Sequence, residues 1–209
     1  MAARKTHETA ECRQTLEELI RLTCPGRANE LSNRLVDRFG SLPDAVAART
    51  ADRTAILDGA PEVERTIQCL RKAMNHILRG RIQQRRVMSN ERALLDYLRQ
   101  AMAFEPIEQF RVIFLNAANE MLADEILGIG TVSRVHLYPR EVMKRCLEIG
   151  ATAIILVHNH PAGTAEPSRA DRNLTQRMMA AAQPLAVTVH DHLVICRDGY
   201  VSFRKAGLM

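Results

Sequence analysis

The sequence predicts two parts, a small all-helical N-terminal domain followed by a mixed α/β domain. Apolar residues recur every three or four positions through residues 11–80, the spacing of amphipathic helices. Short branched apolar runs, typical of strands, begin only after residue 105 and alternate with helical patterns. A basic segment over residues 79–86 separates the two patterns. We therefore expect domains at 1–80 and 90–209, joined by a basic linker at 81–89.

The N-terminal part contains successive helical segments between clear breaks. Residues 1–10 carry no such pattern and are expected to form a flexible tail. Gly40 follows one apolar repeat as a helix end signal. Ser41 and Pro43 open the next segment, because serine caps helices and proline is tolerated in their first turn. The predicted helices cover residues 15–23, 31–39, a short stretch that begins at Ser41, and 62–80.

The second part interleaves helices and strands. Asn90 is a plausible cap for a helix over 90–102. Proline at position 139 and glycine at 150 bound a second helix, and Ser168 precedes a third. Hairpin turn signals lie at 116–119 and at Asp198-Gly199. The predicted strands cover residues 110–115, 121–127, 132–138, 154–157, 185–189, 193–196 and 200–203, which together form a mixed sheet.

One stretch carries metal-binding chemistry. A buried strand, 154–157, leads directly into His158-Asn159-His160. Residues two apart on a strand point to the same face, so the two imidazoles can converge. Asp171 lies in the first turn of the helix that follows. Two histidines and one carboxylate, with a fourth position open to water, match a catalytic zinc site rather than a closed structural one.

Ser168 and Asp171 also have a purely structural interpretation. Ser-x-x-Asp before a helix is a variant of the capping box and needs no metal. A histidine at a strand end is most often solvated or hydrogen-bonded. The two interpretations are compatible, because a cap can fix the helix start that aims the carboxylate.

The pattern His-x-His, seven residues, Ser-x-x-Asp resembles the JAMM (MPN+) signature of zinc metalloproteases. Residues 88–209 are similar to the RadC branch of that group. This resemblance implies a cytidine-deaminase-like JAMM/MPN fold, Zn²⁺ bound by His158, His160 and Asp171, and cleavage of amide bonds in a protein or peptide substrate. Ala162 departs from the family, which has serine there, at a position that is not a ligand. The segments that carry the resemblance are Pro139–Val142, Ala153–Pro161, Glu166–Asp171, Asp191–His192 and Tyr200–Phe203.

The resemblance also implies a general base and a hydrogen-bond donor. The family has a glutamate in a Glu-x-Phe pattern before an early strand, which Glu108-Gln109-Phe110 matches. Glu105 is the second candidate. Ser168 would donate a hydrogen bond to the attacking water or to the developing oxyanion. His192 recurs in the family, and both support of a metal ligand and a structural role at a strand end stay open for it.

The net charge of +5 lies entirely in the first part. Residues 1–86 carry 16 Lys and Arg against 11 Asp and Glu, whereas residues 87–209 carry 13 of each. This excess is compatible with weak DNA contact or with a solvated helical face. The N-terminal part also resembles the helix-hairpin-helix region of RadC proteins, but Pro61 removes an N–H donor from the corresponding turn, 59–61.

Five scattered cysteines without a Cys-x-x-Cys pattern indicate a reducing compartment and argue against a thiolate zinc site. No signal peptide or apolar run of membrane-spanning length is apparent, so we expect a cytoplasmic protein. Three function classes result: a zinc peptidase or isopeptidase, which the intact motif favours; a DNA-repair-associated nucleic-acid-binding protein; and a metal-binding interaction module without turnover. His136 and His190 carry only weak signals.

Overall fold

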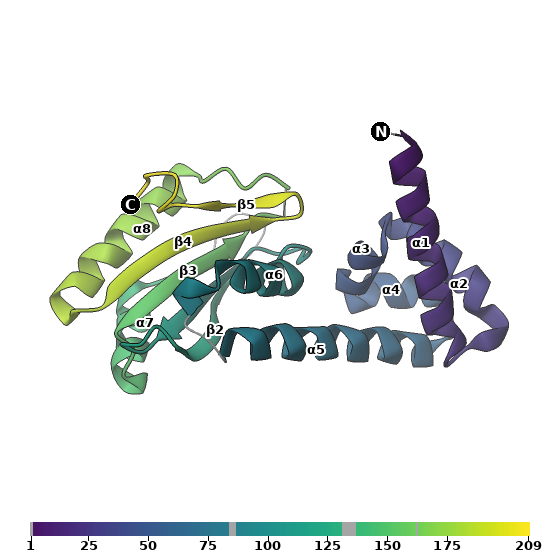
Figure 1. The fold of residues 1–209 in the computed structure, drawn as a ribbon, viewed down its shortest axis with the longest axis horizontal. Helices are drawn as coiled ribbons and strands as arrows, with labels where there is room; N and C mark the ends of the chain where they lie inside the picture. Colours follow the sequence, from purple (N-terminus) through teal and green to yellow (C-terminus); the bar gives the residue numbers. More distant parts are fainter. Residues whose placement is uncertain (1, 84–86, 131–136, 162) are drawn as a thin grey trace. The chain divides into compact units, whose positions relative to one another are not determined.

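The computed structural model describes residues 2–83, 87–130, 137–161 and 163–209 (Figure 1). The chain divides into two compact units, residues 1–76 and 77–209. Helix α5 (Pro61–Gln83) continues through the first three residues of the predicted linker. Within the described residues, no helix combines the length and the apolar content needed to cross a membrane.

The N-terminal unit is all-helical, as predicted. Gly40 ends α2 with a φ of 87°, a conformation that favours glycine, and the Ser41 side chain accepts a hydrogen bond from the Asp44 backbone at the start of α3. The predicted flexible tail is wrong, because helix α1 begins at Ala2 and continues the amphipathic segment. The helices are α1 (Ala2–Arg21), α2 (Ala28–Phe39), α3 (Leu42–Ala47), α4 (Thr50–Leu57) and the first part of α5. Their shared core is formed by Leu16, Ile20, Leu31, Leu35, Leu57, Val63 and Ile67.

The second unit is built on a five-stranded mixed sheet in the order β2-β1-β3-β4-β5. Strands β3 and β4 are parallel, and the other neighbours are antiparallel. Helix α8 (Arg169–Ala182) makes the crossover that parallel neighbours require. The strands are β1 (Gln109–Leu115), β2 (Met121–Ile129), β3 (Ala153–Asn159), β4 (Thr188–Cys196) and β5 (Gly199–Ser202).

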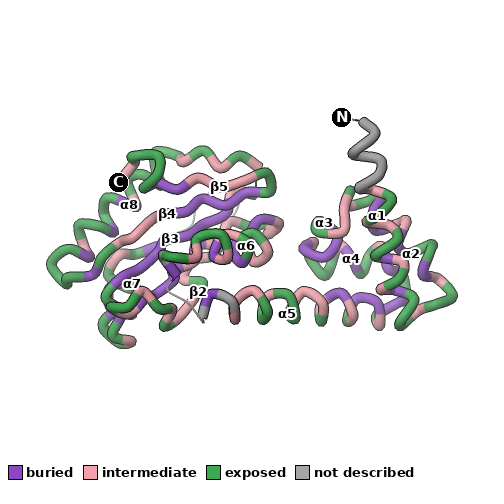
Figure 2. Tube along the Cα trace, in the orientation of Figure 1, coloured by how far each residue is buried: buried purple, intermediate pink, exposed green. Residues whose placement is uncertain are grey.

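Two separate apolar clusters cover the two faces of this sheet. Helix α6 (Glu91–Met102) packs on one face, against Ile113, Ile155 and Leu193. Helices α7 (Pro139–Ile149) and α8 pack on the other, against Phe110, Val112 and neighbouring residues. Strand β3 lies between them and is buried along its whole length (Figure 2). The continuous apolar run of β3 is therefore the run expected of a strand covered on both faces.

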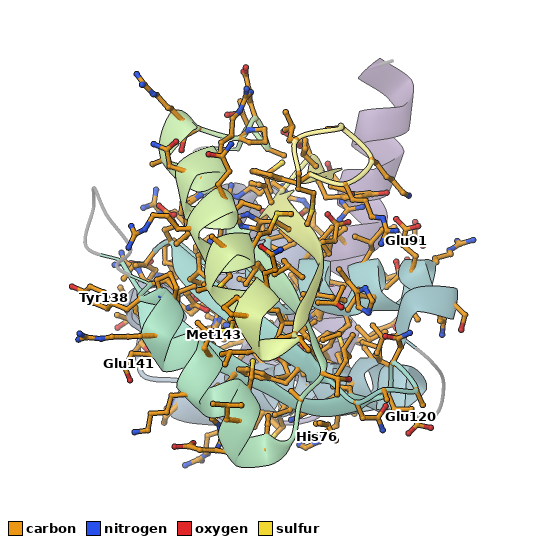
Figure 3. All side chains as sticks on the ribbon, turned by 90° about the vertical axis from the view of Figure 1, so that its left-hand side faces the viewer. His76, Glu91, Glu120, Tyr138, Glu141 and Met143 are labelled. Carbon is orange, nitrogen blue, oxygen red and sulfur yellow. The ribbon has the colours of Figure 1, made fainter. Side chains whose placement is uncertain are left out.

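Helix α7 shows how one face is selected for burial. Tyr138 and Glu141 lie at the exposed start of the helix, whereas Met143 lies in the interior (Figure 3). Gly150 ends the helix with a φ of 70°, as the glycine signal predicted.

Three local predictions differ from the structure or lie outside the part it describes. Asn90 occupies the N-cap position of α6 but its side chain makes no capping hydrogen bond. The predicted strands 185–189 and 193–196 are replaced by one strand, β4, which begins only at Thr188 because Gln183–Leu185 form a 3₁₀ helix. A register shift beside His190 lets the polar segment between the two predicted strands continue the pairing with β3. Residues 132–136 of the predicted strand 132–138 lie outside the described residues.

Candidate metal centre

The centre begins at the carboxyl end of β3. His158 is completely buried on the α7/α8 face of the sheet, because it alternates with Ile154 and Leu156 on that face. Its ring stacks on Phe110 of the neighbouring strand, with ring centroids 5.5 Å apart and planes 9° from parallel. Burial in the strand and the stacked ring fix the position of this imidazole before any ligand is considered.

His160 and Asp171 complete a group of three. His160 follows the strand by one residue and is partly exposed, and Asp171 lies in the first turn of α8. The Nε2 atoms of His158 and His160 are 3.0 Å apart. Asp171 Oδ1 lies 3.4 Å from His158 Nε2, and Asp171 Oδ2 lies 3.6 Å from His160 Nε2. This group of nitrogen and oxygen ligand atoms could hold a metal ion.

A complete capping box aims the carboxylate. The Ser168 hydroxyl accepts a hydrogen bond from the Asp171 backbone N–H at 3.2 Å, and Asp171 Oδ2 accepts from the Ser168 backbone N–H at 2.7 Å. Ser168 is exposed, and no acceptor for its hydroxyl hydrogen is present among the described residues. Ser168 thus caps helix α8, and its hydroxyl hydrogen stays available for a further hydrogen bond.

The electrostatics of the group favour a positive charge at its centre. Burial alone would raise the pKa of Asp171, but the close approach of the His158 and His160 rings, at 3.4 and 3.6 Å, outweighs burial and holds that pKa well below its usual range. The nearby Asp171 carboxylate in turn raises the pKa of His160. Either a proton or a metal cation can supply this charge.

The orientation of His160 is fixed from outside the group. Its Nδ1 lies 2.9 Å from the carbonyl oxygen of Thr164. A carbonyl can only accept, so Nδ1 carries hydrogen, and Nε2 is left to face His158 and Asp171. The loop after β3 therefore selects the ring nitrogen that points into the centre.

Behind His158 lies a buried support formed by His192 and Thr175. His158 Nδ1 is 2.8 Å from His192 Nε2, and His192 Nδ1 is 2.6 Å from Thr175 Oγ1. Burial lowers the pKa of His192 well below its ordinary value, and the neighbouring His158 lowers it further. Sequence reasoning raised a supporting role for His192 but missed Thr175, whose only signal is its position one helical turn after Asp171.

Glu108 directly precedes β1, two residues before Phe110. Phe110 and His158 are the last pair of the antiparallel β1/β3 register, and beyond it the Gln109 backbone N–H donates to the Asn159 side chain instead. The Glu108 side chain is half-buried, and its charge contributes to the raised pKa of His160. The second candidate, Glu105, is half-buried and its Oε2 accepts a hydrogen bond from Gln109 Nε2 at 3.4 Å.

Asn159 holds the segment that carries Glu108, a role that the sequence did not suggest. Its Oδ1 accepts from the Gln109 backbone N–H at 2.8 Å, and its Nδ2 donates to the Glu105 and Ile107 carbonyls at 3.2 Å each. Asn159 stands between the two histidines in the sequence and points to the opposite face of the sheet. It is completely buried there. It therefore ties the candidate base to the strand that carries the ligands.

The other sequence candidates lie elsewhere. His190 contacts Asn119 Oδ1 at 2.6 Å, at the opposite end of the sheet from the group of three. His136 and Ala162 are outside the described residues. In the N-terminal unit, several arginines are already paired with carboxylates, so the basic composition does not by itself favour DNA contact, which stays a prediction. These pairs join Arg13 to Asp37, Arg21 to Glu17, Arg27 and Arg34 to Glu30, and Arg49 to Asp52.

Comparison with known proteins covers most of the chain. Residues 88–208 match the family model described as a RadC-like JAB domain. A protein of Rhodobacter capsulatus named UPF0758 protein is 45% identical over 179 residues, which are 86% of this chain and 84% of that protein. All the residues of the candidate centre fall inside the matched region.

Proposed function

Because the chain belongs to the RadC family of JAB-domain proteins, we propose that it is a zinc-dependent hydrolase of the JAMM type. Its substrates would be peptide or isopeptide amide bonds in a protein or peptide. The observation that carries this proposal is the convergence of His158, His160 and Asp171 at one point, with partly exposed groups on its outer side.

The donor set and its spacing suit zinc. Ligand bonds of about 2.0–2.1 Å in a tetrahedron place neighbouring ligand atoms roughly 3.3–3.4 Å apart. The three separations at the centre, 3.0, 3.4 and 3.6 Å, bracket that value. Three protein ligands leave one tetrahedral position for water, the arrangement of catalytic rather than structural zinc. Zinc bound there would lower the pKa of a water ligand toward neutrality and so supply the nucleophile.

Glu108 would act as the general base. The charge of its carboxylate acts on His160, and it would accept a proton from the attacking water and return it to the leaving amine nitrogen. Asn159 would keep the backbone around Glu108 in place during these transfers. Glu105 suits this role less well, since its carboxylate already accepts a hydrogen bond from Gln109.

Ser168 would stabilise the negative charge that develops on the carbonyl oxygen of the substrate. The capping bond uses the Ser168 oxygen as an acceptor, so the hydroxyl hydrogen can be donated to that oxyanion. Preorganised donors of this kind contribute about 2.7–4 kcal/mol where they have been removed in other hydrolases.

Replacing Glu108 by Gln tests the assignment. We expect hydrolysis of a mixed panel of fluorogenic peptides and lysine-linked isopeptides to fall by about 10²–10⁴-fold, because a general base contributes that much. Zinc content should equal that of the wild type. Glu105→Gln is the matched control and should keep most of the activity. Full activity in Glu108→Gln, or a greater loss in Glu105→Gln, would show that the base is assigned to the wrong residue.

A further inference from the structure

A buried series of hydrogen bonds, here called the chain behind His158, starts at the ring nitrogen of His158 that faces away from the candidate metal centre. It passes from His158 Nδ1 to His192 Nε2 at 2.8 Å, from His192 Nδ1 to Thr175 Oγ1 at 2.6 Å, and from Thr175 Oγ1 to the Asp171 carbonyl oxygen at 2.7 Å. His158, His192 and Thr175 are all completely buried. The chain starts on one metal-ligand candidate and ends on the backbone of another.

The direction of these hydrogen bonds decides which nitrogen of His158 is available. A neutral imidazole carries hydrogen on one nitrogen only. If Thr175 donates to the Asp171 carbonyl, its oxygen accepts from His192 Nδ1–H. His192 Nε2 then accepts from His158 Nδ1–H. In this arrangement, the ligand form, His158 Nε2 keeps its lone pair and faces the centre.

The opposite direction disables the same ligand. If Thr175 donates to His192 Nδ1, then His192 Nε2–H donates to His158 Nδ1, and hydrogen must occupy His158 Nε2. That hydrogen would point into the centre, where a metal ion needs a lone pair. Both arrangements contain the same number of hydrogens. They differ in the acceptor that the Thr175 hydroxyl takes, and only the ligand form uses the Asp171 carbonyl.

The surroundings of the His192 ring leave the direction of these hydrogen bonds to the members of the chain themselves. The ring lies against Phe203, with centroids 4.5 Å apart, and against Phe110 at 5.4 Å. Among the described residues, no carboxylate oxygen forms a hydrogen bond with the His192 ring; the Asp191 carboxylate accepts only from the His192 backbone N–H, at 2.7 Å. Within the part of the protein that the structure describes, His158 and Thr175 are thus the hydrogen-bond partners of the two ring nitrogens. Thr175 is therefore the member of the chain that can redirect its hydrogen.

We propose that Thr175 and His192 are positioning residues that select the ligand form of His158 and so set the affinity of the centre for zinc. This inference rests on the proposed zinc site. In that role Thr175 acts through two hydrogen bonds, by accepting from His192 and by donating to the Asp171 carbonyl. The helix that supplies one candidate ligand thereby also prepares the other.

Two substitutions at position 175 separate the hydroxyl from the shape of the side chain. Thr175→Val has nearly the same shape but leaves His192 Nδ1–H of the ligand form without an acceptor. Thr175→Ser is the matched control, because it keeps the hydroxyl and loses only a methyl group. We expect zinc affinity, measured with Zn²⁺ against a chromophoric chelator, to fall about 10–100-fold in Thr175→Val. In Thr175→Ser the affinity should stay within about threefold of the wild type.

Ring-nitrogen NMR shifts of the histidines in the metal-free wild type show which ring nitrogens carry hydrogen before zinc binds, a readout that a purely structural role would not alter. We expect hydrogen on Nδ1 and none on Nε2 of His192. Hydrogen on His192 Nε2, or equal zinc affinities in wild type and Thr175→Val, would overturn the inference. If zinc binding and the His192 hydrogen position are as expected but no hydrolysis is found, only the proposed activity is contradicted. Normal hydrolysis with zinc affinity unaffected by Thr175→Val would remove only the positioning role.

Discussion

The sheet of the second unit carries a buried polar cluster on each face, and the two clusters differ in how their charges are balanced. On the α6 face, Arg111 Nη1 donates to Asp124 Oδ2 at 2.6 Å and to the Tyr97 hydroxyl at 3.0 Å. On the α7/α8 face, His158 and His160 converge with Asp171. The first cluster pairs a permanent cation with an anion, whereas the second brings two imidazole nitrogens to one carboxylate and contains no permanent cation.

This difference separates a structural cluster from a candidate functional one. Tyr97 also hydrogen-bonds Asp124, and burial, followed by the charge of Asp124, raises the pKa of Tyr97 to about 12. The phenol thus stays protonated and donates, so the charge of the α6-face cluster is balanced within the cluster. The α7/α8-face cluster reaches such a balance only with an added proton or metal ion. Burial of polar groups is therefore not by itself a sign of function, and neither is an unsatisfied hydrogen bond, since Arg111 Nε and Asp124 Oδ1 are buried without partners among the described residues. What distinguishes the candidate centre is a buried carboxylate that faces no permanent cation in the described ranges of the chain.

The largest expected effect is on the α6-face cluster. Asp124→Ala leaves the Arg111 guanidinium buried without its anion, so we expect the free energy of unfolding in urea to fall by about 3–5 kcal/mol. Zinc content of the folded protein should not change, because this cluster lies across the sheet from the centre.

A double variant provides the control for that prediction. Arg111→Met combined with Asp124→Leu removes both charges and should be more stable than Asp124→Ala alone, since apolar replacements of a buried pair are often tolerated. A double variant that is less stable than the single one, or loss of zinc from folded Asp124→Ala, would contradict the proposed separation of the two clusters.

The N-terminal unit provides a second self-compensated pair with a pH signature. Arg53 donates two hydrogen bonds of 2.8 Å to Glu64, and both side chains are buried. Burial would raise the pKa of Glu64, but the hydrogen bonds from Arg53 and Gln68 outweigh it and lower the pKa below 4.5. The unfolded chain then binds more protons than the folded one below that pH, so stability that is present above it is lost on acidification.

Glu64→Gln tests this dependence, because the amide keeps the shape and removes the titration. We expect the wild type to be more stable than the variant near pH 7, and this advantage to shrink as the pH falls below about 4.5. Urea unfolding at a series of pH values measures it. An advantage that grows on acidification would mean that the charge of Glu64 does not stabilise the fold.

The smallest expected effect concerns the cap that joins structure and chemistry at Ser168. Ser168→Ala removes the capping hydrogen bond and should lower the free energy of unfolding by about 1 kcal/mol. Ser168→Gly costs only a few tenths of a kcal/mol as an N-cap, so most of the stability should return while the side-chain donor stays absent. Hydrolysis that recovers together with stability in Ser168→Gly would reduce Ser168 to a cap.

Much of the fold could be predicted from local patterns. The apolar run of β3, the glycine after α7 and the serine before α8 each determine a local structure through burial or backbone geometry, and the structure contains all three. The break predicted near residue 190 was wrong, since pairing with β3 overrides the polarity of that segment. The prediction for Asn90 was right in position only: the residue occupies the N-cap of α6, but its side chain makes no capping hydrogen bond.

The candidate centre was predictable to the extent that its residues lie close in sequence. His158, His160, Ser168 and Asp171 fall within fourteen residues and are brought together by one strand, one loop and one helix start. Asn159 and Thr175 escaped because their roles depend on partners far away in the chain, at the start of β1 and in β4. Hydrogen bonds of this kind depend on tertiary packing, which no local pattern encodes.

The most direct test of the central claim is the metal content of the protein purified without chelators, measured by elemental mass spectrometry beside the double variant His158→Ala/His160→Ala. We predict about one zinc per chain in the wild type and essentially none in the double variant, because two of the three protein ligands are then missing. Wild-type protein without zinc, or a double variant that retains it, would contradict a zinc site at the end of β3.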